Sequence, residues 1–205
     1  RVAAGAVARA ILGRLGVRIV AHAIEIAGIQ AKRCEYDVIE NNPVRCADPD
    51  VAPLMEEAIL NARAMKDSVG GIIQLEIYGL PPGLGDPVFG KLDARLCSAI
   101  MTIGAIKGVE VGDGFAITKL SGSKANDGMD TAGFTSNHHG GILGGISSGA
   151  PVIMRVAVKP TASIASTQHT VTVTGEPCEV EVRGRHDPCI VVRAVPVVEN
   201  MAAFV

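Results

Sequence analysis

The pattern of apolar residues changes near Gly104. Before that point, amphipathic segments of helical period alternate with runs of β-branched residues. Between Gly104 and Gly149 the apolar runs are short and lie between Gly, Ser, Asn and Asp. Because strand and helix do not alternate regularly, we predict an α+β fold rather than a doubly wound one. No segment repeats with a period of about 20–50 residues, which argues against a solenoid.

Periodicity and turn residues predict the main elements. Asp48-Pro-Asp50 is typical of a helix start, with either acid as the cap, and Gly70-Gly71 is expected to end that helix. The segment after Pro188 is expected to be helical despite Pro196. The remaining expected elements are helices over about 2–15 and 87–103, strands over 17–29, 72–78 and 152–158, and a hairpin of 171–174 with 180–182.

Composition limits the possible partners. The chain has 205 residues, which fits one large domain or two small ones. The 19 basic and 21 acidic residues give a net charge of −2, so charge alone indicates neither nucleic acid nor an anionic membrane as a partner. Only 3% of residues are aromatic and the apolar runs are too short to span a membrane. Five cysteines without a CxxC pair favour reduced thiols and a cytoplasmic location.

The two ends of the chain are apolar and uncapped. Arg1 precedes a helical pattern without an N-cap residue, and the last residues, Met201 to Val205, stop on an apolar face. We therefore expect the chain to be a fragment of a longer protein.

A glycine cluster lies between residues 140 and 149. Its Gly-Gly-x-x-Gly-Gly pattern permits positive φ and close approach of a ligand to the backbone. It lacks the Lys-Ser/Thr of a Walker loop and the Gly-x-Gly-x-x-Gly of a Rossmann fold. The sequence leaves two interpretations open, a ligand-binding loop and a tightly packed turn.

Two further segments combine charge with hydrogen-bond donors. Lys159-Pro-Thr-Ala-Ser163 follows an apolar strand and could contact a phosphate, or could be a solvated strand exit with a proline turn. Arg183-Gly-Arg-His-Asp-Pro-Cys189 offers two guanidinium groups, an imidazole and a carboxylate. Asp187 could cap a following helix, and an arginine beside it would keep it ionised, as a proton acceptor requires.

The histidines give weaker indications. His138-His139 could form a metal pair, but no third ligand stands at suitable spacing, so we predict no metal site. His22 and His169 lie in strand-like runs and are expected to be packing or surface residues.

Several long motifs in one order resemble chorismate synthases, and the resemblance covers essentially the whole chain. The motifs are Arg1-Val-Ala-Ala-Gly-Ala-Val-Ala8, Gly108-Val-Glu-Val-Gly-Asp-Gly-Phe115, Ser136-Asn-His-His-Gly-Gly-Ile-Leu-Gly-Gly-Ile-Ser-Ser-Gly149, Lys159-Pro-Thr-Ala-Ser-Ile164 and Gly184-Arg-His-Asp-Pro-Cys189.

The resemblance implies an enzyme that eliminates phosphate from 5-enolpyruvylshikimate 3-phosphate to give chorismate, in the shikimate pathway. It implies reduced FMN as cofactor, NADP as an associated nucleotide, transient electron donation from the flavin, and removal of the C6 hydrogen with flavin N5 involved. It also implies a partial β-α-β sandwich and a homotetramer. Residues 1–205 would be the C-terminal portion of a single domain, without the N-terminal signatures and their active-site histidine.

Family positions transfer to this sequence residue by residue. The resemblance implies flavin contacts at Gly104, Ala105, Gly144 and Arg185 and along the segment Lys159, Pro160, Thr161, Ala162 and Ser163. Arg185 also matches a substrate-contacting arginine, and Asp187 matches the carboxylate proposed to act in deprotonation. Gly104 stands where relatives commonly carry Asn, and His139 stands where Ala is usual.

One alternative remains open. The chain could be a non-catalytic module that binds a phosphate ligand weakly or supports oligomer contacts. Titration with FMN distinguishes the two hypotheses, because tight and saturable binding favours a preformed cofactor site.

Overall fold

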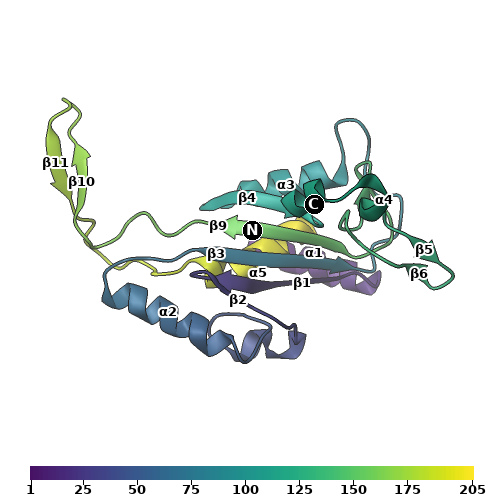
Figure 1. The fold of residues 1–205 in the computed structure, drawn as a ribbon, viewed down its shortest axis with the longest axis horizontal. Coiled ribbons are helices and arrows are strands. Elements are labelled where there is room, and N and C mark those ends of the chain that lie inside the picture. Colours follow the sequence, from purple (N-terminus) through teal and green to yellow (C-terminus); the bar gives the residue numbers. More distant parts are fainter. The chain divides into compact units, whose positions relative to one another are not determined.

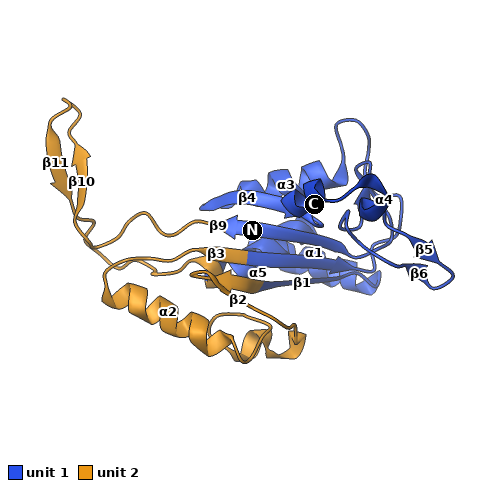
Figure 2. Cartoon of the chain, in the orientation of Figure 1, with its two compact units in different colours: residues 1–22, 73–157, 193–205 blue, residues 23–72, 158–192 orange.

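The computed structural model describes residues 1–205, which form two compact units (Figures 1 and 2). Unit 1 comprises residues 1–22, 73–157 and 193–205, and unit 2 comprises residues 23–72 and 158–192. The α and 3₁₀ (η) helices are α1 Val2–Arg14, η1 Tyr36–Asn41, α2 Ala52–Ala64, α3 Leu92–Met101, η2 Gly114–Lys119, α4 Gly122–Ala125 and α5 Val191–Phe204. None of these helices is both long and apolar enough to cross a membrane.

One sheet of five strands and three short hairpins make up the β-structure. The sheet has the strand order β2-β1-β3-β9-β4, and the hairpins are β5–β6, β7–β8 and β10–β11. The strands are β1 Arg18–Ile26, β2 Ile29–Gln30, β3 Gly71–Tyr78, β4 Ile106–Val111, β5 Met129–Asp130, β6 Gly133–Phe134, β7 Ile142–Leu143, β8 Ile146–Ser147, β9 Val152–Val158, β10 Gln168–Val171 and β11 Pro177–Val180. Strand β9 confirms the strand predicted over 152–158, and its residues alternate between buried and half-buried.

Apolar residues of the helices and of β3 and β9 form the core of unit 1. Helix α3 contacts β4 and buries Leu96 and Ile100. Helix α5 buries Val195 and Val198, and Arg9 Nη1 of α1 lies 2.8 Å from Glu199 Oε2 of α5. The predicted helix around Pro196 is therefore confirmed.

A buried carboxylate, Glu76, lies on β3 of unit 1. Its Oε1 lies 3.2 Å from Nε2 of His22 and accepts a 2.7 Å hydrogen bond from Nε2 of Gln74. Tyr78 donates its hydroxyl to the other oxygen. His22 is thus a buried residue. The buried Glu76 carboxylate has three polar side chains around it, as a charged group in a protein interior requires.

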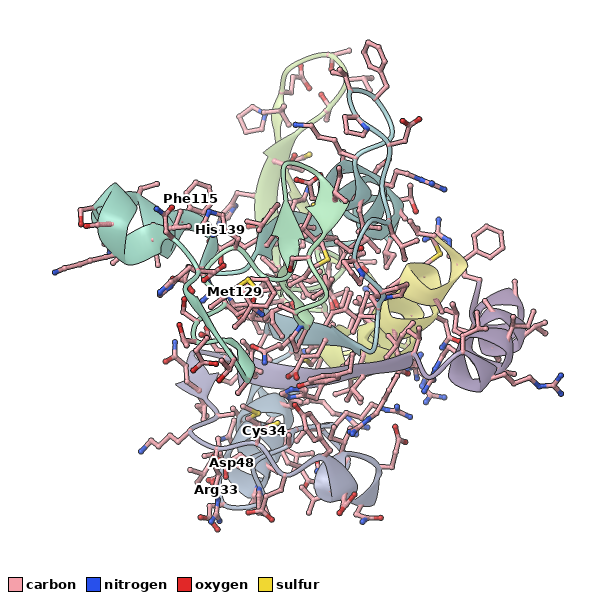
Figure 3. All side chains as sticks on the ribbon, turned by 90° about the vertical axis from the view of Figure 1, so that its right-hand side faces the viewer. Arg33, Cys34, Asp48, Phe115, Met129 and His139 are labelled. Carbon is pink, nitrogen blue, oxygen red and sulfur yellow. The ribbon has the colours of Figure 1, made fainter.

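In unit 2, the carboxylate of Asp48 holds the turn that precedes α2. Its Oδ2 accepts hydrogen bonds from the backbone N–H groups of Lys32 (2.8 Å) and Arg33 (3.2 Å), and its Oδ1 accepts one from Asp50 (3.1 Å). The bond from Lys32 is the largest influence on the Asp48 pKa, and together these bonds outweigh burial and lower it. The side chains of Arg33 and Asp48 also lie close together, with Arg33 Nε 3.5 Å from Asp48 Oδ1 (Figure 3). Neither predicted acid is the N-cap of α2, since Val51 occupies that position.

Helix α2 ends before the glycine pair that was predicted to stop it. The N–H of Lys66 donates to the carbonyl of Arg63 (3.1 Å) and the N–H of Asp67 to that of Ala62 (2.9 Å), which is a Schellman ending. Lys66 takes the left-handed position with φ of 58°. Gly71 instead begins β3, where a Cβ would lie 2.0 Å from the carbonyl oxygen of Glu25. Close strand approach, not helix termination, therefore requires this glycine.

Two other predicted boundaries differ from the structure. Helix α3 begins at Leu92 rather than near Pro87, because Asp86 and Gly90 exchange two backbone hydrogen bonds that close a loop before it. The hairpin β10–β11 lies about three residues earlier than predicted, since Thr172 and Glu176 close its turn with a 2.8 Å backbone bond.

Candidate functional site

The Lys159–Ser163 segment and the Arg185–Asp187 corner lie together in unit 2. The hydroxyl of Thr161 donates a 2.9 Å hydrogen bond to the carbonyl of Asp187. The carbonyl of Thr161 in turn accepts a 2.7 Å hydrogen bond from the hydroxyl of Ser68. The N–H of Val69 donates to the carbonyl of Pro188 at 2.8 Å. These bonds join residues 68–69, 161 and 187–188, which are distant in sequence, and we call this arrangement the junction in unit 2.

A cavity of about 240 Å³ lies against this junction in unit 2. Of the predicted site residues in unit 2, Ser163, Arg185 and Asp187 line it. The other four residues of the segment do not: Lys159, Pro160 and Ala162 are exposed, and Thr161 is half-buried. The end of α2 and the residues that follow it supply further lining residues, which the sequence motifs do not include. These are Arg63, Lys66, Asp67 and Ser68.

The missed residues had an ambiguous sequence pattern. Arg63 and Lys66 fall on the polar side of an amphipathic helix, where charged residues are usually solvated. Only the Schellman ending of α2 and the bond from Ser68 to Thr161 bring them to the cavity. Neither feature has a strong sequence pattern, because the left-handed residue is a lysine rather than a glycine.

The glycine cluster belongs to unit 1 and forms a tight hairpin. Strands β7 and β8 pair with Ile142 opposite Ser147 and Leu143 opposite Ile146. The two turn residues, Gly144 and Gly145, have φ values of 60° and 87°, as a type I′ turn requires. The turn accounts for both glycines without a ligand, yet a Cβ on Gly144 would meet no atom within 4 Å, so its outer side is open.

Gly104 and Ala105 also belong to unit 1, in the turn between α3 and β4. Ala105 has a φ of 70°, in the left-handed region that non-glycine residues seldom occupy. Gly104 is exposed and a Cβ there would meet nothing within 4 Å. The backbone of this turn is thus accessible even though no side chain projects from Gly104.

The carboxylate of Asp127 organises the segment that precedes the glycine hairpin. Its oxygens accept hydrogen bonds from the N–H groups of His138 (2.6 Å) and His139 (3.1 Å) and from the hydroxyl of Ser136 (2.9 Å). Nδ1 of His139, which is labelled in Figure 3, lies 3.1 Å from Asp127 Oδ2. Burial, the largest influence, raises the Asp127 pKa, but these hydrogen bonds together outweigh it and lower the pKa.

The two histidines of this segment pair with different carboxylates. Nδ1 of His138 lies 2.7 Å from Oδ2 of Asp113, whereas His139 faces Asp127. The two acids lie in Gly112-Asp-Gly114 and Asn126-Asp-Gly128. These tripeptides are typical of turns, but they do not indicate that the acids contact the two histidines. The observed role of the pair is therefore to fix the loop.

Comparison with known proteins identifies the family. A model of the family described as "Chorismate synthase" matches residues 1–205. The chain belongs to the chorismate synthase family. A chorismate synthase of Chloroflexus aurantiacus is 49% identical over 210 residues, covering 100% of this chain and 58% of the relative. One of Methanothermobacter thermautotrophicus is 48% identical over 211 residues, covering 98% of this chain and 56% of the relative.

A solved structure described as "Crystal Structure of Chorismate Synthase" has the same fold. It matches with a TM-score of 0.79 and 27% identity, covering 98% of this chain and 59% of that one. The predicted α+β fold of the chorismate synthase type is confirmed. The chain spans somewhat more than half of the length of these relatives.

We predict that Asp127→Asn destabilises the protein by about 1.5–3 kcal/mol, because an amide cannot accept all the charge-assisted bonds that the carboxylate accepts. Glu57→Gln, an exposed change on α2, serves as control and should stay within about 0.5 kcal/mol. Urea unfolding at pH 7 measures both differences.

A comparison of wild type with Asp127→Asn also tests how stability depends on pH. Because the Asp127 pKa is depressed in the folded protein, its contribution is present above the unfolded pKa of about 3.9 and is lost as the pH falls through the folded value. Wild-type stability should therefore decline more steeply than that of Asp127→Asn as the medium becomes acidic below about pH 5. Parallel pH profiles would show that Asp127 does not have this role.

Proposed function

We propose that residues 1–205 form the C-terminal portion of a chorismate synthase domain. The complete enzyme eliminates phosphate from 5-enolpyruvylshikimate 3-phosphate and yields chorismate. In this anti-1,4-elimination the C6–H bond and the C3–O bond break, a proton passes to a base, and phosphate leaves with the bonding electron pair, without net oxidation or reduction. Family membership over the whole chain supports the assignment, and the junction in unit 2 carries the proposed chemistry.

The unit 2 cavity fits an anionic, phosphate-bearing cofactor. Arg63, Lys66 and Arg185 place three cationic side chains on its lining, and Ser163 adds a hydroxyl. A charge-assisted hydrogen bond of this kind contributes about 1.5–3 kcal/mol. Reduced FMN, when bound, supplies electron density that assists the departure of phosphate.

We take the cofactor contacts that family resemblance assigns in each unit separately. In unit 2 these are the segment Lys159, Pro160, Thr161, Ala162 and Ser163, together with Arg185. In unit 1 the backbone of Gly104, Ala105 and Gly144 offers contacts, supported by the open space beside the two glycines and by the left-handed Ala105. Without a side chain at Gly104, only backbone groups serve there.

Asp187 is assigned as the proton acceptor. It is half-buried and lines the same cavity as Arg185. The bond from Thr161 to the Asp187 carbonyl fixes the backbone from which this carboxylate projects. Arg185 also contacts the substrate. We further propose that the complete enzyme is a homotetramer in the cytoplasm and that it binds neither nucleic acid nor a membrane.

We expect the 205 residues alone not to turn over substrate, because they span 58% of the length of the Chloroflexus aurantiacus relative and the resemblance places an active-site histidine outside them. The measurement is anaerobic incubation with reduced FMN and 5-enolpyruvylshikimate 3-phosphate, followed by detection of chorismate. Chorismate formed by the purified chain would contradict this expectation.

In the complete enzyme, Asp187→Asn should lower turnover by about 100-fold or more, as expected for loss of a general base. FMN affinity should change little, because an amide keeps the shape of the side chain. Glu181→Gln, an exposed change elsewhere in unit 2, is the matched control and should retain wild-type turnover. Equal turnover of Asp187→Asn and wild type would remove Asp187 from the mechanism.

A further inference from the structure

The end of α2 brings charge to the unit 2 cavity that family resemblance does not assign. Arg63 and Lys66 line it together with Arg185, and the lining acids are Asp67 and Asp187. Asp67 Oδ1 accepts a 2.7 Å hydrogen bond from the N–H of Ser68, within its own turn. None of the three cationic side chains forms an ion pair with the chain, so their charges are available to a ligand.

Some residues that line the same cavity carry polar groups without a partner in the chain. The N–H groups of Ser163, Ala165 and Arg185 donate to no backbone oxygen of the chain. Nε2 of His186 is buried and makes no hydrogen bond in the structure. Buried polar atoms are normally satisfied, so a polar ligand atom beside this nitrogen would remove the cost of leaving it unpaired.

Lys66 adopts a backbone conformation that disfavours lysine. Its φ of 58° occupies the left-handed position that usually carries glycine at a Schellman ending. A lysine there costs conformational energy that glycine would avoid. This cost is consistent with a use of the ammonium group on the cavity that the residue lines.

We infer that Arg63 and Lys66, together with Arg185 and Ser163, bind a phosphomonoester in the unit 2 cavity. A dianionic phosphate matches clustered guanidinium and ammonium groups with N–H donors better than a carboxylate or a neutral ligand does. This inference rests on the proposed function, which offers two sources of that group: the phosphate tail of FMN and the phosphate of 5-enolpyruvylshikimate 3-phosphate.

The test compares Arg63→Ala and Lys66→Gly with wild type in the complete enzyme. Lys66→Gly removes the charge and relieves the left-handed strain, so it should fold at least as stably as wild type, which thermal melting checks. Lys66→Arg keeps the charge and should retain function, and Lys107→Ala removes an exposed charge from β4 as the matched control. Affinities for FMN and for riboflavin, which lacks the phosphate, are measured with the KM for 5-enolpyruvylshikimate 3-phosphate.

Each outcome is decisive. If the cavity binds the flavin tail, both variants weaken FMN binding by about tenfold or more and leave riboflavin binding unchanged. If it binds the substrate, FMN binding stays and the KM rises by a similar factor. Unchanged FMN affinity and unchanged KM in both variants would overturn the inference while chorismate formation upholds the proposed function. A wild type that forms no chorismate, but whose preference for FMN over riboflavin depends on Arg63 and Lys66, would support the inference and contradict the proposed function.

Discussion

Unit 2 depends on a short series of hydrogen bonds that passes through Thr161. Its carbonyl accepts from Ser68 and its hydroxyl donates to the carbonyl of Asp187, so one residue fastens the end of α2 and the Arg185–Asp187 corner to the segment after β9. The bond from Val69 to Pro188 repeats this connection in the adjoining residues. The end of α2, Ser163 and the Arg185–Asp187 corner line one cavity beside these bonds. The chemistry we assign to Arg185 and Asp187 is therefore a consequence of where Thr161 is held.

Buried carboxylates perform a comparable task in each unit. Asp48 collects backbone N–H groups in unit 2, and Asp127 collects those of His138 and His139 in unit 1. In both residues burial raises the carboxyl pKa, but the hydrogen bonds to the charged form outweigh burial and the pKa is lowered. Loops without regular secondary structure gain defined shapes in this way, because ionised acceptors satisfy several donors at once. The segment before the glycine hairpin is accordingly fixed without a bound ligand.

Much of the regular structure could be predicted from periodicity. The spacing of apolar residues predicts strand β9 and helices α2 and α5, and each of them buries apolar side chains. Helix α5 forms although it contains Pro196. The errors came from residues whose role depends on distant partners. Asp48 holds Lys32 and Arg33 instead of capping a helix, and Gly71 makes room for Glu25 instead of ending one. The Lys159 and Arg185 segments could be selected from charge and donors, but the contribution of α2 could not, since it follows from a left-handed lysine and a serine bond formed only on folding.

Amide hydrogen exchange of the complete enzyme, with and without saturating oxidised FMN, tests most directly whether the junction in unit 2 holds the ligand. We expect slower exchange in peptides that cover 63–68, 159–163 and 184–188, and unchanged exchange in the hairpin β10–β11 of the same unit. The hairpin serves as an internal control because none of its residues lines the cavity. Saturating FMN that leaves the exchange of all three segments unaltered would contradict the account.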